Sequence, residues 1–327
     1  MARNPCLFVV GCARSGTTLL QRLLDAHPQL AVSNDPHFIH EGLRKSAGRD
    51  VPLTADLVER VLACPTLRRL SLSEQEVREA ATTAETYGDF VGAIYTTFAR
   101  KRGKPLAGEK TARYVRYLPL LDAIFPWAKT LHIVRDGRDV ALSMLDWARP
   151  DRGPGRYRLW PEQPIAVCAL SWRWHVTTGQ RDGSARGPSR YQEVRYEGLV
   201  AEPEPTMRRV SAFLELPFAE AMLSYDVSRA PNGAGLCSKE RWLPPTAGLR
   251  HWRTEMAPRD VELFEAIAGD ALAALGYEVV HERISPGVAA LATRCRERWE
   301  ADVRAHLPRK ASRLDFGLRP REYAGLA

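Results

Sequence analysis

An apolar run near the N-terminus leads into a loop bounded by two glycines, and a helical pattern follows the loop at once. Residues 7–11 read Leu-Phe-Val-Val-Gly, and Gly16 precedes the segment Thr-Thr-Leu-Leu. The spacing of Gly11 and Gly16 is that of a phosphate-binding loop, in which backbone N–H groups and the N-terminus of the next helix face an anion. This order of strand, loop and helix predicts an α/β fold with an anion site at the end of the first strand.

The residues inside the loop argue against the commonest nucleotide for such a site. A Walker-type ATP site places a lysine directly after the second glycine, but Thr17 stands there, and the cation of this loop is Arg14. We therefore do not expect ATP with magnesium, and we predict no metal site. Two alternatives stay open: a metal-dependent P-loop kinase or NTPase, and a catalytically inactive nucleotide-binding module.

A second apolar run, Leu-His-Ile-Val at 131–134, ends in the charged segment Arg-Asp-Gly-Arg-Asp. A strand ending there puts Arg135 at its carboxyl end, where open α/β sheets bind ligands, and Ser143 then falls in a helix that begins near Asp139. Arg135 and Ser143 can donate to one phosphate. The alternative is a solvated charge run whose members pair with one another, namely Arg135, Asp136, Arg138 and Asp139.

Together the two motifs resemble the sulfotransferases that use 3′-phosphoadenosine 5′-phosphosulfate (PAPS). The loop Gly-Cys-Ala-Arg-Ser-Gly-Thr-Thr-Leu-Leu at 11–20 is similar to the family's 5′-phosphosulfate loop, and residues 131–144 are similar to its 3′-phosphate site. The resemblance implies that PAPS is the donor and that Arg135 and Ser143 bind its 3′-phosphate. It also implies that the 5′ end is held by loop residues, namely Arg14, Ser15, Gly16, Thr17 and Thr18.

A third element, Pro-Leu-Ala-Gly-Glu-Lys-Thr at 105–111, reads as a short strand that ends in a cation. In sulfotransferases a lysine at the matching place contacts the bridging oxygen of the phosphosulfate. The resemblance thus implies that Lys110, together with Arg14, stabilises the negative charge that develops on the leaving group. The alternative is a surface lysine paired with the adjacent Glu109.

Two later segments extend the resemblance. Tyr196 follows an expected strand, and in the family a tyrosine at this place approaches the adenosine. The alternative is a tyrosine buried in the core, which fits the same pattern. A late basic loop resembles the segment that closes over the 3′-phosphate and adenine, with arginines for phosphate contacts and a tryptophan for stacking. Its candidate residues are Arg241, Arg250, Trp252 and Arg253.

The acceptor base is sought at the end of the strand expected at 30–33. Related enzymes deprotonate the acceptor hydroxyl with a carboxylate or a histidine, and Asp35 and His37 lie within reach of the crevice there. Protein-tyrosine sulfotransferases place a glutamate where this chain has Asn34, which argues against tyrosine sulfation. The alternative role is structural, with Asp35 capping a helix and His37 packed in a loop.

Apolar strands alternate with amphipathic helices along most of the chain. The strands expected near 7–11, 30–33, 105–109, 130–134 and 191–195 predict a doubly wound parallel sheet with a P-loop-type nucleotide site. Residues 54–103 read as helices that form a cap over the crevice. We expect a sulfotransferase α/β domain at 1–280. At 281–327 we expect a C-terminal helix and an extended arm, for which an oligomer contact, partner docking and disorder are all open.

Composition agrees with an enzyme that binds an anionic nucleotide. The chain has 327 residues, 45% of them hydrophobic, which suffices for a sizeable core. Its formal net charge is +8, but Lys and Arg form no block, so we expect no nucleic-acid partner. The six cysteines are scattered without a Cys-x-x-Cys pair, which favours reduced thiols and argues against zinc.

The predicted activity is the transfer of a sulfuryl group from PAPS to a hydroxyl of a small-molecule, phenolic or carbohydrate acceptor. No apolar stretch reaches the length of a membrane span, whereas the Golgi members of the family carry a membrane anchor. We therefore expect a cytoplasmic protein. The identity of the acceptor and a homo-oligomeric state are left open.

Overall fold

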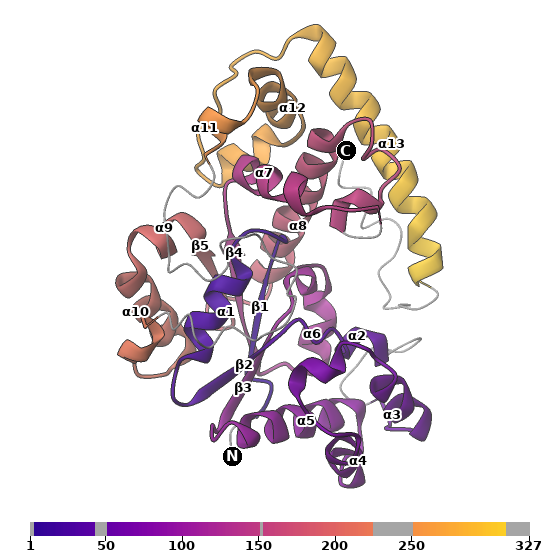
Figure 1. The fold of residues 1–327 in the computed structure, drawn as a ribbon, viewed down its shortest axis with the longest axis vertical. Coiled ribbons are helices and arrows are strands. Elements are labelled where there is room, and N and C mark those ends of the chain that lie inside the picture. Colours follow the sequence, from indigo (N-terminus) through magenta and orange to yellow (C-terminus); the bar gives the residue numbers. More distant parts are fainter. Residues whose placement is uncertain (1–2, 43–50, 151–152, 225–250, 312–327) are drawn as a thin grey trace.

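A computed structural model shows five strands in one sheet, in the order β2-β3-β1-β4-β5 (Figure 1). The structure describes residues 3–42, 51–150, 153–224 and 251–311. All neighbouring strands of this sheet run parallel. They are β1 (Leu7–Gly11), β2 (Leu30–Asn34), β3 (Leu106–Lys110), β4 (Lys129–Val134) and β5 (Tyr191–Arg195). The predicted doubly wound parallel sheet is confirmed, and each strand begins and ends within one residue of the expected position.

Helices connect the strands and cover both faces of the sheet (Figure 1). Between β1 and β3 lie α1 (Thr17–Asp25), α2 (Ile39–Gly42), α3 (Ala55–Leu62), α4 (Glu74–Thr82) and α5 (Tyr87–Lys101). Between β3 and β5 lie α6 (Leu118–Ile124), α7 (Gly137–Trp147) and α8 (Pro164–Ser184). After β5 come α9 (Tyr196–Ala201), α10 (Pro203–Leu214), α11 (Trp252–Glu255), α12 (Pro258–Ala274) and α13 (Pro286–Ala311). Short 3-10 helices are η1 (Leu67–Leu70), η2 (Ala112–Tyr117), η3 (Gly153–Arg156) and η4 (Glu220–Met222).

The strands divide their apolar side chains between two cores. Leu7 and Val9 of β1 pack in the core that includes α1 and α10, whereas Phe8 and Val10 pack in the core that includes α5 and α6. All five residues of β1 are buried, as expected for a parallel strand covered on both faces. The two cores hold the carboxyl end of β1, from which the glycine-bounded loop emerges.

Residues 54–103 are largely helical as predicted, but their longest helix packs on the sheet. Phe90 and Phe98 of α5 belong to the core that includes Phe8 of β1. The segment after α3 instead lies beside the loop that follows β2, where the hydroxyl of Thr66 donates to the carbonyl of Pro36 (2.5 Å). This segment is therefore the part of the expected cap that borders the carboxyl edge of the sheet.

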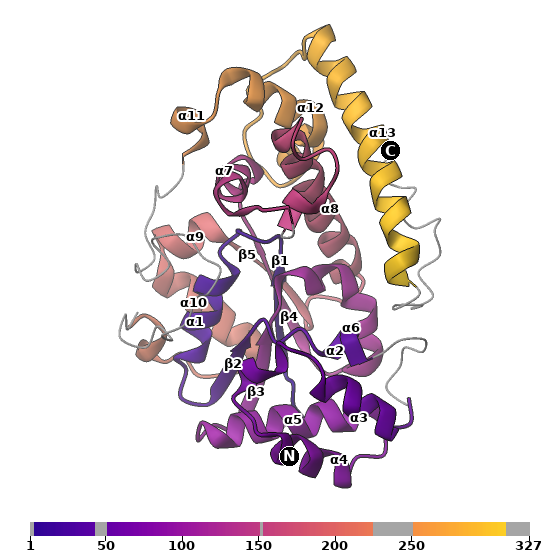
Figure 2. The same cartoon turned by 45° about the vertical axis from the view of Figure 1, so that its right-hand side comes forward.

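Another core lies around α7, α8, α12 and α13, and α13 runs along one side of the molecule (Figure 2). The C-terminal helix expected within 281–327 is α13, whose Trp299 is buried in this core. The arm is expected from Leu307 to Ala327, but residues 307–311 belong to α13, and residues 312–327 lie outside the described residues. Within the described part, no helix is long and apolar enough to cross a membrane.

Candidate active site

The loops that follow β1 to β4 meet at the carboxyl edge of the sheet. Because the strands are parallel, they all end at this edge. The register places Lys110, the last residue of β3, beside Asn34 of β2 and Val9 of β1. Site residues predicted from distant segments thus gather in the region where open α/β sheets bind ligands.

The loop between β1 and α1 has the backbone expected for anion binding. Gly16 caps α1 with φ 92°, a left-handed value that glycine adopts without strain, and Thr17 opens the helix. A Cβ atom on Gly16 would lie 2.4 Å from Cδ2 of Tyr196, so the close ring contact also requires glycine. The Ser15 hydroxyl is buried and has no hydrogen-bond partner among the described residues. A buried donor of this kind suits a phosphate oxygen.

Cys12, inside the same loop, packs as a small apolar residue. Burial raises the pKa of its thiol to about 12, so it is not a thiolate nucleophile at neutral pH. The cysteines of the described part are all free thiols, as the sequence predicts.

Arg14 connects the loop to the second phosphate motif. Its backbone has φ 76°, and its Nε donates to Oγ of Ser143 on α7 (3.0 Å). Its guanidinium carbon lies 5.8 Å from the centre of the Trp147 ring. The structure therefore brings together two motifs that are more than a hundred residues apart in the sequence.

Lys110 lies between the phosphate loop and β2. Its ammonium donates to Oγ1 of Thr18 (3.3 Å) and to Oδ2 of Asp35 (2.6 Å), and the residue is 2% exposed. The neighbouring Glu109 faces the other side of the sheet, because side chains alternate along a strand, and accepts from the hydroxyl of Tyr95. The alternative interpretation, in which Lys110 is a surface lysine paired with Glu109, is therefore wrong.

Asp35 and His37 form a close pair after β2, with Oδ1 of Asp35 3.6 Å from Nε2 of His37. Burial by itself would raise the pKa of Asp35, but Lys110 together with His37 and Arg69 outweighs burial, so this pKa lies below its usual value. Burial lowers the pKa of His37 to about 3, and the nearby Arg113 adds to the effect. At neutral pH the pair is a carboxylate and a neutral imidazole. The Asp35 carboxylate bonds to Lys110 and does not serve as a helix cap.

Arg135 follows the last residue of β4 and is 7% exposed. Its Nη2 lies 3.5 Å from Oδ2 of Asp139, and its guanidinium carbon lies 4.3 Å from the centre of the Tyr196 ring. Its buried Nε has no hydrogen-bond partner among the residues that the structure describes. Tyr196 thus contacts one residue of each predicted phosphate site, Arg135 of the 3′ site and Gly16 of the 5′ loop.

The charge run after β4 is self-paired, but it is buried and not solvated. Arg138 is 1% exposed and bonds to Oδ2 of Asp136 (2.8 Å) and to Oε1 of Glu265 on α12 (2.7 Å). Asp136 also caps α7, so the helix begins at Gly137 and not near Asp139 as expected. The hydrogen bonds of Arg138 therefore connect the start of α7 to α12.

The late basic loop is described only in part. Arg241 and Arg250 lie outside the described residues. Trp252 is 9% exposed, and its ring centre lies 3.6 Å from the guanidinium carbon of Arg138 and 4.4 Å from that of Arg253. Arg253 also forms a surface ion pair with a glutamate. Protein groups engage Trp252 and Arg253, and their contact with a nucleotide stays a prediction.

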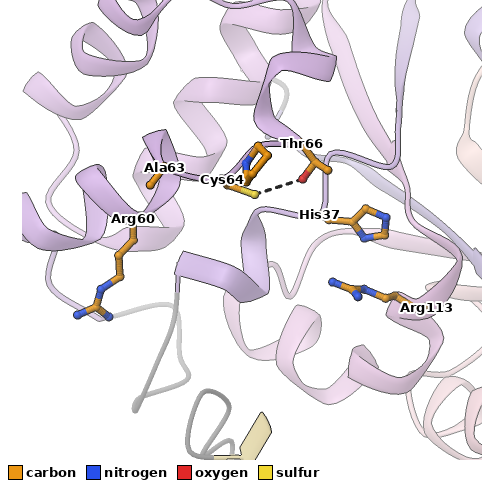
Figure 3. Close-up of a pocket in the computed structure, with 7 residues that line it drawn as sticks. His37, Arg60, Ala63, Cys64, Thr66 and Arg113 are labelled. Atoms are coloured by element: carbon orange, nitrogen blue, oxygen red, sulfur yellow. Dashed lines mark hydrogen bonds between the residues drawn. The ribbon is translucent and has the colours of Figure 1, made fainter. Parts of the chain in front are cut away.

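A cavity of about 510 Å³ lies beside the Asp35–His37 pair (Figure 3). It is lined by residues of the loop after β2, of α3 and the following turn, and of η2, namely His37, Arg60, Ala63, Cys64, Pro65, Thr66 and Arg113. The His37 ring and the Arg113 guanidinium lie near each other in the close-up (Figure 3). Because the His37 ring also faces Asp35, a molecule in this cavity is one side chain away from the carboxylate.

The motifs do not predict the buried position of Glu109 or the half-buried position of Asp139. Both carboxyl groups have a pKa above the usual value, chiefly because of burial. A signal for Glu109 is present in the sequence. If Lys110 faces the phosphate loop, the preceding residue must face the opposite layer of helices, where a glutamate is unusual.

Comparison with known proteins agrees with this geometry. A model of the Sulfotransferase family matches residues 5–220. Protein-tyrosine sulfotransferase 1 of Danio rerio is 27% identical over 84% of this chain and 72% of its own length. Nodulation protein NoeE of Sinorhizobium fredii is 27% identical over 83% of this chain and 65% of its own length.

A solved structure shows the same fold. The sulfotransferase domain from the Synechococcus PCC 7002 olefin synthase aligns with a TM-score of 0.59 and 21% identity, over 85% of this chain and 96% of that domain. The family model spans the sheet, the phosphate loop and the segment of Lys110 and Arg135, well over half of the chain. The protein is therefore an enzyme that belongs to the sulfotransferase family.

Proposed function

We propose that this enzyme transfers the sulfuryl group of PAPS to the hydroxyl of a phenolic acceptor. The observation that carries the proposal is the position of Lys110, whose ammonium contacts both Thr18 at the start of α1 and the Asp35 carboxylate. A cation, an anion-binding loop and a carboxylate thus meet at one point. Sulfuryl transfer needs these three groups, for the leaving oxygen, the donor phosphate and the acceptor proton.

Two separate phosphate sites support PAPS as the donor. Oγ of Ser15 and Nε of Arg135 are buried donors without a partner among the described residues, and the contact of Arg14 with Ser143 joins their surroundings. PAPS carries phosphate groups on both the 3′ and 5′ positions of one ribose, whereas AMP carries only one, so the residues present suit PAPS. Those that would hold it are Arg14, Ser15, Gly16, Thr17, Thr18, Arg135, Ser143 and Tyr196.

PAPS supplies an activated sulfuryl group, and the residues of this chain position the reactants and move one proton. The Asp35 carboxylate accepts the proton of the acceptor hydroxyl while the acceptor oxygen bonds to sulfur. Lys110 and Arg14 stabilise the charge that develops on the phosphate oxygen as its bond to sulfur breaks. When the Lys110 ammonium turns to that oxygen, Asp35 loses part of its counter-charge, and its pKa rises toward that of an effective base.

A phenol is the acceptor that the site and the relatives have in common. Relatives from several animals are named protein-tyrosine sulfotransferase, and a tyrosine side chain is a phenol. The sequence argues against tyrosine because Asn34 replaces the expected glutamate, but Asp35 supplies a carboxylate one residue later. The cavity gives an aromatic ring room beside His37, whose own ring is the neighbour of this carboxylate. Small-molecule alcohols and carbohydrates are the alternative acceptors.

The test is a transfer assay with PAPS labelled in its sulfuryl group. Separate reactions with EDTA contain p-nitrophenol, tyramine, a tyrosine peptide, an aliphatic alcohol or a glycan. We expect label in a phenolic product, and about 100-fold less with Lys110→Ala. Label in no product would contradict the proposal. Magnesium-dependent phosphate transfer from ATP would establish a P-loop kinase or NTPase, and tight binding of 3′,5′-bisphosphoadenosine (PAP) without transfer would establish an inactive nucleotide-binding module.

A further inference from the structure

A carboxylate lies beside the arginine of the proposed 3′-phosphate site. Oδ2 of Asp139 is 3.5 Å from Nη2 of Arg135, the residue that follows β4. Arg135 also has a buried Nε without a hydrogen-bond partner among the described residues. A carboxylate at this place competes with a phosphate for the guanidinium and repels its negative charge. Pairing with Arg135 alone therefore gives a donor site no advantage, and the second oxygen of Asp139 shows what else the residue does.

That second oxygen holds the backbone of Trp252. Oδ1 of Asp139 accepts from the N–H of Trp252 at 3.0 Å, a normal length for such a hydrogen bond. The contact with Arg135 is longer, at 3.5 Å, so the carboxylate is bound closely to Trp252 and loosely to the arginine. Arg135 can therefore turn toward a phosphate while Asp139 keeps its bond to Trp252.

Trp252 is attached to the first turn of α7 by its ring as well. The ring centre lies 3.6 Å from the guanidinium carbon of Arg138, and Trp252 is 9% exposed. The backbone and the ring of Trp252 thus contact two adjacent residues of one helical turn, Asp139 and Arg138. This turn begins just after Arg135, and α11, which Trp252 opens, lies beside α7 in both views (Figures 1 and 2). The start of α11 is therefore held against the segment that presents Arg135.

The surroundings of Asp139 do not favour its negative charge. Burial raises the pKa of its carboxyl group above the usual value, although Arg135 opposes this shift. Asp136, which caps the same helix, places a second carboxylate in the first turn. A phosphate bound to Arg135 would add further negative charge. The property of Asp139 that a donor site can use is thus its hydrogen-bond acceptor and not its charge.

We propose that Asp139 is a positioning residue of the donor site, which holds the Trp252 backbone against the first turn of α7 and so fixes one wall of the 3′-phosphate site beside Arg135. This inference rests on the proposed function, in which Arg135 binds the 3′-phosphate of PAPS. An ionised carboxylate has no proton to donate to a phosphate, so Asp139 acts through the groups that it holds. Its removal changes the affinity for PAP and leaves that for AMP, which has no 3′-phosphate.

Two substitutions separate the acceptor from the charge. Asp139→Asn keeps an oxygen that can accept from the Trp252 N–H and removes the charge, whereas Asp139→Ala removes both. In calorimetric titrations we expect Asp139→Ala to bind PAP about tenfold more weakly than the wild type, because the ligand must then order the released segment. Asp139→Asn should bind PAP within about 3-fold of the wild type, since the hydrogen bond that orders the segment is kept. The affinity for AMP should be unchanged in both variants.

The matched control is Asp270→Ala. Asp270 of α12 also pairs with an arginine, Arg173 at 2.7 Å, but its side chain is 66% exposed. Its removal should leave the affinity for PAP unchanged, because exposed ion pairs contribute little. Thermal melting first establishes that each variant is folded. Should Asp139→Ala fail to fold, Asp139→Asn decides alone, since a tenfold loss of PAP affinity in this variant would contradict the role of the acceptor oxygen.

Amide hydrogen exchange tests the positioning without any ligand. In Asp139→Ala the peptide that covers residues 252–256 should exchange at least about tenfold faster than in the wild type, and in Asp139→Asn at nearly the wild-type rate. Unchanged exchange in Asp139→Ala, or an equal loss of affinity for PAP and AMP, would overturn the proposal. Equal binding of PAP and AMP by the wild type would refute the proposed donor site, and exchange would still decide whether Asp139 holds Trp252.

Discussion

The two ends of the donor site differ in how their charges are satisfied. At the transfer end, Lys110 and Asp35 form a close ion pair at 2.6 Å, and the lysine is 2% exposed. At the 3′-phosphate end, Arg135 reaches Asp139 only at 3.5 Å, and its buried Nε has no partner among the described residues. One end is internally paired, and the other keeps a donor that an anion can use.

This difference separates chemistry from binding. A group that only binds can keep its donor unpaired, because the ligand supplies the partner in the ground state and the transition state alike. A group that acts in the chemical step must exchange partners. Lys110 is paired with Asp35 before the reaction, and Asp35 is the partner that it gives up. Substitutions at the transfer end should therefore change turnover, whereas those at the 3′ end should change donor affinity.

Removal of Lys110 is the change with the largest expected effect. Lys110→Ala should lower kcat by about two to three powers of ten and leave PAP affinity nearly unchanged, because the ammonium acts mainly as the bond from sulfur to the leaving oxygen breaks. Lys110→Arg should restore only part of the rate, since a planar guanidinium cannot replace a point charge. Steady-state kinetics with PAP titrations measure both quantities.

The matched control for this prediction is Lys101→Ala. Lys101 is a half-exposed lysine of α5 paired with Glu76, and its removal should leave kcat unchanged. An increase in donor KM for Lys110→Ala with kcat preserved would remove the distinction between the two ends.

Asp35→Asn should have the next largest effect. On a poorly acidic alcohol kcat should fall by about 100-fold, and the loss should be smaller on an acidic phenol, whose proton needs less help. Because the pKa of Asp35 lies below the usual value for an aspartate, kcat/KM should lose the Asp35 contribution only as pH falls below about 4. Rate profiles for the two acceptors provide the measurement.

His37→Ala sharpens the assignment of the base. The pKa of His37 is held at about 3, so this residue stays neutral near pH 7 and contributes no titration there. We therefore expect His37→Ala to leave the shape of the pH profile near pH 7 unchanged. If turnover on the alcohol survives Asp35→Asn undiminished, the base lies elsewhere.

The 3′ end should give smaller effects, and these should appear in donor KM. Arg135→Ala should raise it by about 10- to 100-fold, the range for a lost charge-assisted hydrogen bond, while kcat at saturation changes little. Ser143→Ala should raise it by only about 3- to 5-fold, because a neutral hydroxyl contributes less. Abolished turnover with intact donor affinity in either variant would show that this region does not bind the 3′-phosphate.

The sheet and the strand ends could be predicted from local pattern. Strands β1, β2 and β4 contain short apolar runs, and the cations Lys110 and Arg135 mark where β3 and β4 end. The Lys110–Asp35 pair could not be predicted, because it depends on strand order. β3 lies between β1 and β2, and that order puts Asn34 in register with Lys110. Nothing in the local sequence fixes which strands are neighbours.

The late basic loop shows a second limit of local pattern. The local pattern predicts that Trp252 stacks on a base, and it does not predict the contact that the ring makes with the guanidinium of Arg138. Arg138 in turn donates a hydrogen bond to Glu265, which lies 127 residues later in the chain. A charge run that looks solvated in the sequence is thus part of a core that forms only when α7 meets α12.

The most direct test of a donor site with two phosphate ends is the comparison of PAP with AMP in thermal-shift and calorimetric titrations, with EDTA present. We expect PAP to bind far more tightly than AMP or ATP, and we expect Arg135→Ala to reduce the affinity for PAP toward that for AMP. Equal stabilisation by PAP and AMP, or stabilisation by ATP only with magnesium, would contradict the account.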